Sequence, residues 1–565
     1  MTGITTRFAL AVAAAVTTVL VATSCGARPM DLQERQQSRE FQNAQDRVAG
    51  WHGGIQDTEI RLFNTDPVRP LIPGDTNEWG GCRVVNQLFT GLVSYGDYDG
   101  APVNAMAESI ETTDSKVFTI TIKGGWKFHD GTPVRAKNFV DAWNYTAYGP
   151  NEQRNNGFFD KIQGYDDLNP VAAPGQPPPA PEADKLSGLE VLGPHTFRLT
   201  LNAPFSVFKT MLGYSAFYPL PDSFFRDPAA FPRHPIGNGP YRFVSAQHGV
   251  NQKVTAFKEY QGTRKPRIKD VTYTVFPTVI EAYQAVLDGR LDYLEDVPHD
   301  KIVSGAYKTE LAGRHTDQDY LLLQALAFPS YLPGYDNPDL RKAVSMAIDR
   351  ESIIENTLGG TLPPADGWAI RGVDGYTPDQ CGEFCTYNPS KAREHLARSG
   401  FTGPLKLFSN SESGSTFWAP AICRDITANL GIGCEFDGSE PFRELFGKIV
   451  NKEMAGSYRW DWRADYPSIE NFLNPIHRTG QSANSHGYSD LAFDAAMVEA
   501  DSAASREEAN SLYQKAERML ADDMPTIPLW QEWSTSGWSP RLKNVKTNIF
   551  TDLILTDVQV AQPRR

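Results

Sequence analysis

Six cysteines carry the chemistry that is most easily recognised from residue type and spacing. They stand at Cys25, Cys82, Cys381, Cys385, Cys423 and Cys434. Cys381 with Cys385 and Cys423 with Cys434 are the local pairs most easily bridged in an oxidising compartment, which would leave Cys82 free. A zinc site is the competing interpretation, but three residues separate Cys381 from Cys385 and no histidine cluster stands nearby. The spacing favours disulfides or buried thiols and leaves the connectivity open.

Motifs for nucleotide, acyl-transfer or metalloprotease chemistry are absent from the sequence. There is no phosphate-binding G-x-x-x-x-G-K-[ST], no G-x-S-x-G, no H-E-x-x-H and no dinucleotide-binding G-x-G-x-x-G. The ten histidines are widely spaced, without ligand-like pairs. The sequence therefore favours a protein that is not an enzyme and holds no metal or cofactor. Folding can still assemble distant residues, so an exported hydrolase that uses scattered carboxylates stays open as an alternative.

The elements that must position functional residues are of mixed type. Residues 117–122, 196–201 and 271–275 alternate apolar and polar positions, which predicts half-buried strands. Asn337 followed by Pro338 predicts the start of a helix, and Ser505 with Glu508 forms a capping box before another. Between Asn169 and Asp184 a proline-rich stretch indicates a surface loop. The expected fold class is α/β.

Length and charge limit the classes of protein. A chain of 565 residues exceeds the ~250–300 residues of a single core, so we expect two or three lobes. The net charge of −14 provides no strong positive field for a phosphate backbone, so no nucleic acid is expected as a partner. The mean hydropathy of −0.41 argues against a polytopic membrane protein.

The N-terminus indicates export. Arg7 precedes an apolar run over residues 8–22, about the length of a signal core and too short for a comfortable span of ~20 residues. The run ends in VATSCG, which resembles the cleavage box of bacterial lipoproteins, although Ala22 stands where leucine is commonest. The resemblance implies that Cys25 is the first mature residue and carries a lipid. A plain secretory leader is the alternative, and the polar residues after Cys25 indicate a flexible tether.

Residues 123–143, KGGWKFHDGTPVRAKNFVDAW, resemble the signature of the extracellular solute-binding proteins of family 5, the peptide- and oligopeptide-binding receptors of ABC importers. Further matches follow in the expected order. They are NQLFTGL at 86–92, GNGPY at 237–241, RKAVSMAIDR at 341–350 and PTIPL at 525–529. The signature itself indicates a turn followed by a helix, in which His129 is a structural residue rather than a catalyst.

Residues 459–467, RWDWRADYP, resemble the ligand segment of that family. The resemblance implies that Asp465 receives the α-ammonium of a peptide while the backbone of the segment pairs with the peptide as an added strand. A fixed carboxylate at ~4 Å attracts an ammonium by ~4 kcal/mol at an effective dielectric of 20. Trp462 would supply an aromatic wall and Arg459 would meet carboxylates. The alternative is that Asp465 caps a turn and the tryptophans are core residues.

Two further features bear on the ligand. Trp460, Asp461 and Arg463 differ from the small or apolar residues usual in the family, and Asp461 and Arg463 are counted as candidate ligand residues. Residues 75–83, DTNEWGGCR, form a second candidate wall through Asn77 and Glu78. In this stretch Asp75 or Thr76 could instead cap the following helix.

The resemblance implies a type II periplasmic-binding-protein fold with two main lobes and a subdomain inserted in the first. The expected parts are a lipoprotein signal (1–25), a tether (26–56), a discontinuous first lobe (57–92, 195–276 and 525–565), its inserted subdomain (93–194) and a second lobe (277–524). The lobes would close on a short peptide and present it to an ABC permease with ATPase subunits. We expect a monomer held at the outer face of the cell membrane by its lipid alone. The same fold binding a nickel chelate, haem or an oligosaccharide is the first alternative.

Overall fold

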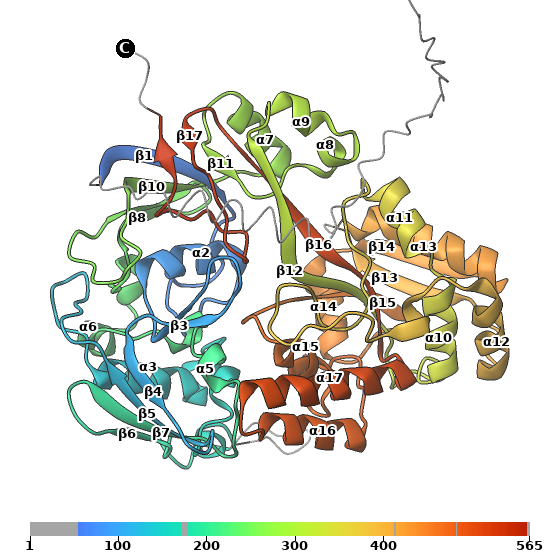
Figure 1. Cartoon of the computed structure of the whole chain (residues 1–565), viewed down its shortest axis with the longest axis horizontal. Helices are drawn as coiled ribbons and strands as arrows, with labels where there is room; N and C mark the ends of the chain where they lie inside the picture. Colours follow the sequence, from blue (N-terminus) through green and yellow to red (C-terminus); the bar gives the residue numbers. More distant parts are fainter. Residues whose placement is uncertain (1–54, 171–178, 412–413, 482, 562–565) are drawn as a thin grey trace, which may run out of the picture. The chain divides into compact units, whose positions relative to one another are not determined.

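The computed structural model of the chain describes residues 55–170, 179–411, 414–481 and 483–561 (Figure 1). These residues belong to one compact unit. The predicted signal peptide, nearly all of the predicted tether and most of the proline-rich loop lie outside the described residues. No helix in the described part of the chain is long and apolar enough to cross a membrane.

The largest element is a mixed ten-stranded sheet. In spatial order its strands are β14 (Cys434–Glu440), β13 (Leu405–Asn410), β15 (Ser457–Arg463), β12 (His315–Ala327), β16 (Thr526–Trp538), β11 (Tyr293–Leu294), β1 (Gln56–Asn64), β10 (Ile268–Val275), β9 (Asn251–Ala256) and β8 (Tyr241–Gln247). Segments far apart in the sequence therefore become neighbours in one hydrogen-bonded scaffold.

Two strands of 13 residues, β12 and β16, lie in the middle of this sheet. On one side of them lie β15, β13 and β14, and on the other side lie β11, β1, β10, β9 and β8. β12 and β16 run antiparallel from the pair His315 and Gly537 to the pair Ala327 and Thr526, and Figure 1 shows them side by side across the centre of the view. On its other side β12 pairs with β15, whereas β16 pairs with β11. The last residues of β12 are buried, as expected for a strand packed on both faces.

Smaller sheets complete the β-structure. They are the four-stranded β4 (Ala107–Glu111), β5 (Val117–Ile122), β7 (Thr196–Thr200) and β6 (Leu189–Val191), and the pairs β2 (Val93–Tyr95) with β3 (Pro102–Asn104) and β17 (Leu542–Lys543) with β18 (Gln559–Val560). β5 has the bounds predicted from its alternating pattern, and its apolar residues are the buried ones. β7 ends one residue before its prediction, and β10 begins three residues earlier than predicted.

The helices pack around these sheets (Figure 1). They are α2 (Trp79–Leu88), α3 (Ala136–Ala147), α4 (Tyr165–Leu168), α5 (Phe208–Met211), α6 (Asp222–Arg226), α7 (Val279–Leu287), α8 (His299–Val303), α9 (Ala306–Glu310), α10 (Pro338–Ala347), α11 (Arg350–Thr357), α12 (Pro389–Ser399), α13 (Ser415–Leu430), α14 (Phe442–Val450), α15 (Glu470–His477), α16 (Leu491–Asp501) and α17 (Arg506–Asp523). Both predicted caps are present, because Asn337 accepts from the Asp339 N–H and Ser505 accepts from the Glu508 N–H.

The signature segment forms the turn and helix expected of it. The Phe128 N–H donates to the Thr132 carbonyl oxygen at 2.8 Å, and Gly131 adopts a φ of +86°, which favours glycine. The ring of His129 lies against the main chain, where Nδ1 accepts from the Gly237 N–H at 3.2 Å. Burial lowers the pKa of His129 to about 4, so the ring is neutral at physiological pH. His129 therefore links the turn to the loop at Gly237 by a hydrogen bond.

A buried arginine, Arg83 of α2, ties several remote segments together. Its guanidinium donates to the Phe63 carbonyl oxygen of β1 and forms a buried ion pair with Glu295, just after β11. A second carboxylate, Asp552, lies 3.7 Å from the Arg83 Nε. Burial raises the pKa of Glu295, whereas the Arg83 charge opposes that rise. Because each partner alone would be an uncompensated buried charge, the pair fixes how α2 packs on the sheet.

Four of the cysteines form two disulfides in this structure. Cys381 is bonded to Cys385, and Cys423 of α13 is bonded to Cys434 at the start of β14. Cys82 is a free thiol, and Cys25 lies outside the described residues. These are the two pairs that the sequence spacing favoured. The predicted lobe and subdomain boundaries remain a prediction.

Candidate ligand-binding site

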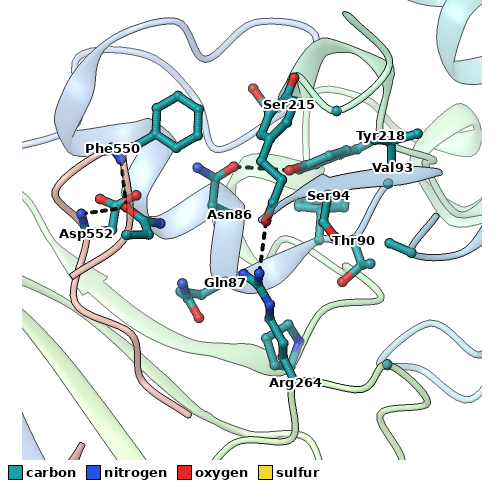
Figure 2. Close-up of a pocket in the computed structure, with 18 of the residues that line it drawn as sticks. Asn86, Gln87, Thr90, Val93, Ser94, Ser215, Tyr218, Arg264, Phe550 and Asp552 are labelled. Atoms are coloured by element: carbon teal, nitrogen blue, oxygen red, sulfur yellow. Dashed lines mark hydrogen bonds between the residues drawn. The ribbon is translucent and has the colours of Figure 1, made fainter. Parts of the chain in front are cut away.

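A cavity of about 500 Å³ lies where α2, the loops around it and the end of β15 meet. Figure 2 shows part of its lining, in which side chains from the α2 helix face those of the C-terminal loop. The wall is a mixture of aromatic rings, amides and charges rather than a purely apolar surface. Its charged residues include Glu78, Arg83, Asp97, Lys123, Arg264, Arg463, Asp465 and Asp552. The size and the mixed lining are typical of a pocket for a small polar ligand.

The helix α2 supplies one wall and is started by Glu78. The Glu78 Oε2 accepts from the Gly81 N–H at 2.8 Å, so this carboxylate is the N-cap of the helix. Burial raises its pKa. Asp75 instead binds Arg69 at 2.6 Å, and the Thr76 hydroxyl donates to the Pro70 carbonyl oxygen. The cap expected at Asp75 or Thr76 is therefore made by Glu78, which also lines the cavity together with the exposed Asn77.

Asp465 also lines the cavity and lies two residues after the end of β15. Its side chain is held by Asn471, whose Nδ2 donates to the Asp465 Oδ2 at 3.2 Å. The Asp465 N–H in turn donates to the Asn471 Oδ1 at 2.9 Å. Burial raises the pKa of Asp465 to about 6, although Asn471 and the charge of Arg463 act in the opposite direction. Asp465 is thus a rigidly held carboxylate that lacks a close cationic partner among the described residues.

Arg463, the last residue of β15, projects into the same cavity. Its guanidinium lies over the ring of Tyr320 on β12, 5.1 Å from the ring centroid. Its Nη2 donates to the Phe550 carbonyl oxygen at 3.5 Å, a long hydrogen bond. Burial disfavours the charge of Arg463, but nearby Tyr320 and Asp552 outweigh it and raise the pKa. Arg463 is therefore a permanent cation at the cavity wall.

Three other predicted ligand residues do not line this cavity. Arg459 forms an ion pair with Asp461 two residues further along β15. The Trp462 Nε1 donates to the Asn471 Oδ1 at 3.2 Å, and its ring stacks on Trp460 with the centroids 6.1 Å apart. Trp462 therefore supports the amide that holds Asp465 instead of forming a wall of this cavity.

Several lining residues were missed by the sequence reasoning. Tyr218 donates to the Asn86 Oδ1 at 3.3 Å, and Arg264 donates to the Tyr95 carbonyl oxygen at 2.9 Å (Figure 2). Phe550 comes from a C-terminal loop more than 400 residues from α2 in the sequence. These residues lie in loops without a periodic pattern or motif of their own, so no local signal marked them.

The free cysteine also lines the cavity, but it is not a nucleophile there. Burial raises the pKa of the Cys82 thiol to about 12, and the charges of Glu78 and Asp465 add to the rise. The thiolate, which is the reactive form, is therefore scarce at neutral pH. Among the described residues there is also no group of three or more His, Cys, Asp or Glu side chains that could hold a metal ion.

The chain combines one large mixed sheet with a cavity lined by residues from remote segments. Comparison with known proteins shows which family has this arrangement. Residues 101–484 match the model of a family described as bacterial extracellular solute-binding proteins, family 5 middle. This match spans more than half of the chain. The protein therefore belongs to the family 5 bacterial extracellular solute-binding proteins, as the signature predicted.

Individual relatives are similar over most of the chain at low identity. The oligopeptide-binding protein OppA of Bacillus subtilis is 23% identical over 512 residues, which is 86% of this chain and 89% of that protein. The glutathione-binding protein GsiB of Pectobacterium atrosepticum is 25% identical over 496 residues, which is 84% of this chain and 88% of that protein.

Among solved structures, OppA of Haemophilus influenzae in complex with RPPGFSPFR superposes with a TM-score of 0.74 at 20% identity. The match covers 90% of this chain and 100% of that one. The likeness confirms the predicted α/β periplasmic-binding-protein fold.

The raised pKa of Asp465 makes a prediction about stability. The ionised carboxylate is less stable in the folded cavity than in the unfolded chain, so ionisation above pH 6 destabilises the ligand-free protein. Asp465→Asn should therefore raise the free energy of unfolding at pH 7.5 by about 1–3 kcal/mol, since one pKa unit corresponds to ~1.4 kcal/mol and Asp465 is partly exposed. The gain should shrink as the pH falls from 6 towards 3.8.

Urea denaturation of ligand-free protein at a series of pH values measures this difference. Asp437→Asn is the matched control, because hydrogen bonds from Ser439 lower the pKa of that exposed carboxyl and predict the opposite sign. An Asp465→Asn variant that is no more stable than the wild type at pH 7.5 would contradict the assigned pKa.

Proposed function

We propose that this protein is the substrate-binding component of an ABC importer that captures short peptides and delivers them to a membrane permease. Hydrolysis of ATP by partner subunits would drive import, since the chain lacks a phosphate-binding loop. The protein itself performs no catalysis in this proposal. It acts as a monomer that binds and releases its ligand unchanged.

The observation that carries the proposal is the state of Asp465. A half-buried carboxylate without a close cation is unfavourable, and a bound ammonium group would relieve that cost. The N-terminal ammonium of a peptide is such a group, and it is common to peptides of any sequence. The Asn471 Nδ2 donates to the carboxylate, and the Asp465 N–H donates back to the Asn471 Oδ1. These two bonds hold the carboxylate in one orientation, so it would set the position of the first peptide residue.

The pairing of β15 supports peptide binding by added-strand hydrogen bonds. Its neighbour β13 pairs only with Ser457 and Tyr458, whereas β12 pairs with Tyr458–Arg463 on the other side. In the described sheet, the edge of β15 beyond Tyr458 therefore has no strand on the β13 side. An extended peptide can pair with this edge through its main chain, which gives affinity without reading side chains.

Peptide binding should depend on both Asp465 and pH. Asp465→Asn should weaken the binding of an unmodified tripeptide about 10- to 100-fold in calorimetric titration at pH 7.5, because it removes a charge-assisted contact. The affinity of the wild type should fall as the pH is lowered from 7.5 to 5, since Asp465 becomes protonated near pH 6 while the peptide ammonium stays charged. The affinity of the variant should change little over this range.

An N-acetylated form of the same tripeptide is the control, because it lacks the ammonium. It should bind weakly to both proteins, and the substitution should not affect it. Equal affinity of wild type and Asp465→Asn for the unmodified peptide would reject Asp465 as the ammonium site.

The non-peptide alternative rests on Asp461, Arg463 and Trp460, where the chain differs from the usual ligand segment. Mass spectrometry of small molecules released by denaturing a form that begins after Cys25, purified without added ligand, distinguishes the two. We expect a set of short peptides of mixed sequence. A single non-peptide compound or a metal complex would favour the alternative, and turnover of peptides or glycosides would favour a hydrolase.

Anchoring through a lipid on Cys25 is part of the proposal and rests on the sequence before the described residues. Several acyl chains hold a soluble body at a membrane, because each buried CH₂ contributes ~0.8 kcal/mol. Cys25→Ala should abolish the lipid on the mature protein and move the protein from the membrane fraction to the soluble fraction. Intact-mass measurement and fractionation check this, and an unchanged membrane fraction would contradict it.

A further inference from the structure

Arg463 and Asp465 carry opposite charges in one cavity but do not pair with each other. The charge of Arg463 acts on Asp465 and opposes the rise of its pKa, so the two groups are near. Nevertheless no ion pair within 4.0 Å joins them in the described structure. Each is held by other residues instead, Asp465 by Asn471 and Arg463 by the ring of Tyr320.

The guanidinium of Arg463 has hydrogen-bonding capacity to spare. Of its five N–H donors, the described residues engage one, in the 3.5 Å contact with the Phe550 carbonyl oxygen. The Arg463 Cζ lies over the ring of Tyr320, 5.1 Å from the centroid, and the side chain is only half-buried. The other N–H groups along the edge of the guanidinium plane donate no hydrogen bond to the described residues. Two parallel N–H groups on such an edge match the two oxygens of a carboxylate.

Neighbouring carboxylates do not occupy this edge. Asp552 and Asp296 both act on the charge of Arg463, but neither comes within 4.0 Å of it in the described structure. Asp552 lies 3.7 Å from Arg83, and Asp296 is exposed. The buried cation of Arg83 thus attracts Asp552, and Arg463 keeps N–H donors for a ligand.

The spacing of the two groups limits what the ligand can be. Arg463 and Asp465 are two positions apart in the sequence, with Ala464 between them, which corresponds to at most ~7 Å between their Cα atoms. The Asp465 Oδ2 accepts from Asn471, and its Oδ1 accepts no hydrogen bond from the described residues. A ligand that satisfies both groups therefore carries both an ammonium and a carboxylate, placed so that the two can reach the same cavity wall.

We infer that Arg463 is a specificity-determining residue that binds a ligand carboxylate close to the N-terminal ammonium. This inference rests on the proposed function and narrows its substrate class to peptides with a negative charge within the first two residues. The carboxylate has two sources, the side chain of an acidic first or second residue or the free C-terminus of a dipeptide. Both present a planar carboxylate, at somewhat different distances from the ammonium.

Two pairs of peptides that differ only in this charge test the inference by calorimetric titration of ligand-free protein. Ala-Asp-Ala amide against Ala-Asn-Ala amide tests the side-chain source, and Ala-Ala against Ala-Ala amide tests the terminal source. In at least one pair the wild type should bind the carboxylate peptide about tenfold more tightly or better, as expected for a charge-assisted bidentate contact. Arg463→Met should remove this preference, so that the two members of each pair bind with similar affinity.

Two further variants give the comparison its controls. Arg463→Lys keeps the positive charge but loses the two parallel N–H donors of the guanidinium, so it should retain part of the preference for the carboxylate peptides. Arg398→Met removes an exposed arginine that binds Asp339 and does not line the cavity. This variant should retain the full preference for the carboxylate peptides. If Arg463→Met does not fold, two results still test the inference. They are the preference of the wild type for the carboxylate peptides and the partial loss of that preference in Arg463→Lys.

The outcomes separate this inference from the proposed function. Equal affinity of the wild type within both pairs would overturn the inference and leave peptide binding intact. A preference that persists unchanged in Arg463→Met would also overturn it, since another residue would then bind the carboxylate. Failure of every peptide to bind would overturn the proposed function and the inference with it.

Discussion

The cavity depends on one buried cation, the guanidinium of Arg83. It contacts the Phe63 carbonyl oxygen, pairs with Glu295, attracts Asp552 and lies over the ring of Trp79, 4.6 Å from its centroid. These partners come from the start, the middle and the end of the chain. A buried charge is tolerated only when its surroundings satisfy it, so the segments that form the cavity floor must all be in place together. The cavity is therefore a product of the whole fold and of no single segment.

Features that depend on local sequence patterns, such as strands and helix caps, were predicted from the sequence. The alternation over residues 117–122 reappears as β5, and the cap at Asn337 begins α10, because such signals need only a few neighbouring residues. The family was also predicted correctly from its ordered motifs and confirmed by comparison. The disulfide pairs follow the same rule, since short loops bring Cys381 to Cys385 and Cys423 to Cys434.

The details of the site could not be predicted in the same way. Arg459, Asp461 and Arg463 occupy alternate positions of one strand and share a face, yet only Arg463 lines the cavity. Strand periodicity gives the face of a side chain but not how far along the strand a cavity extends. Tyr218 and Phe550 were missed for a related reason. They approach α2 through tertiary packing of irregular loops, and no local sequence pattern predicts such packing.

The disulfide of Cys434 has a consequence for the sheet as a whole. It ties down the first residue of β14, which is the outermost strand at that end, and the exposed positions that follow include Glu435 and Asp437. An outer strand with free backbone groups is a template for aggregation, and acidic side chains together with a covalent tie to α13 oppose it. If β15 pairs with extended peptides as proposed, the other strand edges must be blocked. The edge of β14 is guarded in this way, so self-association is discouraged at that end of the sheet.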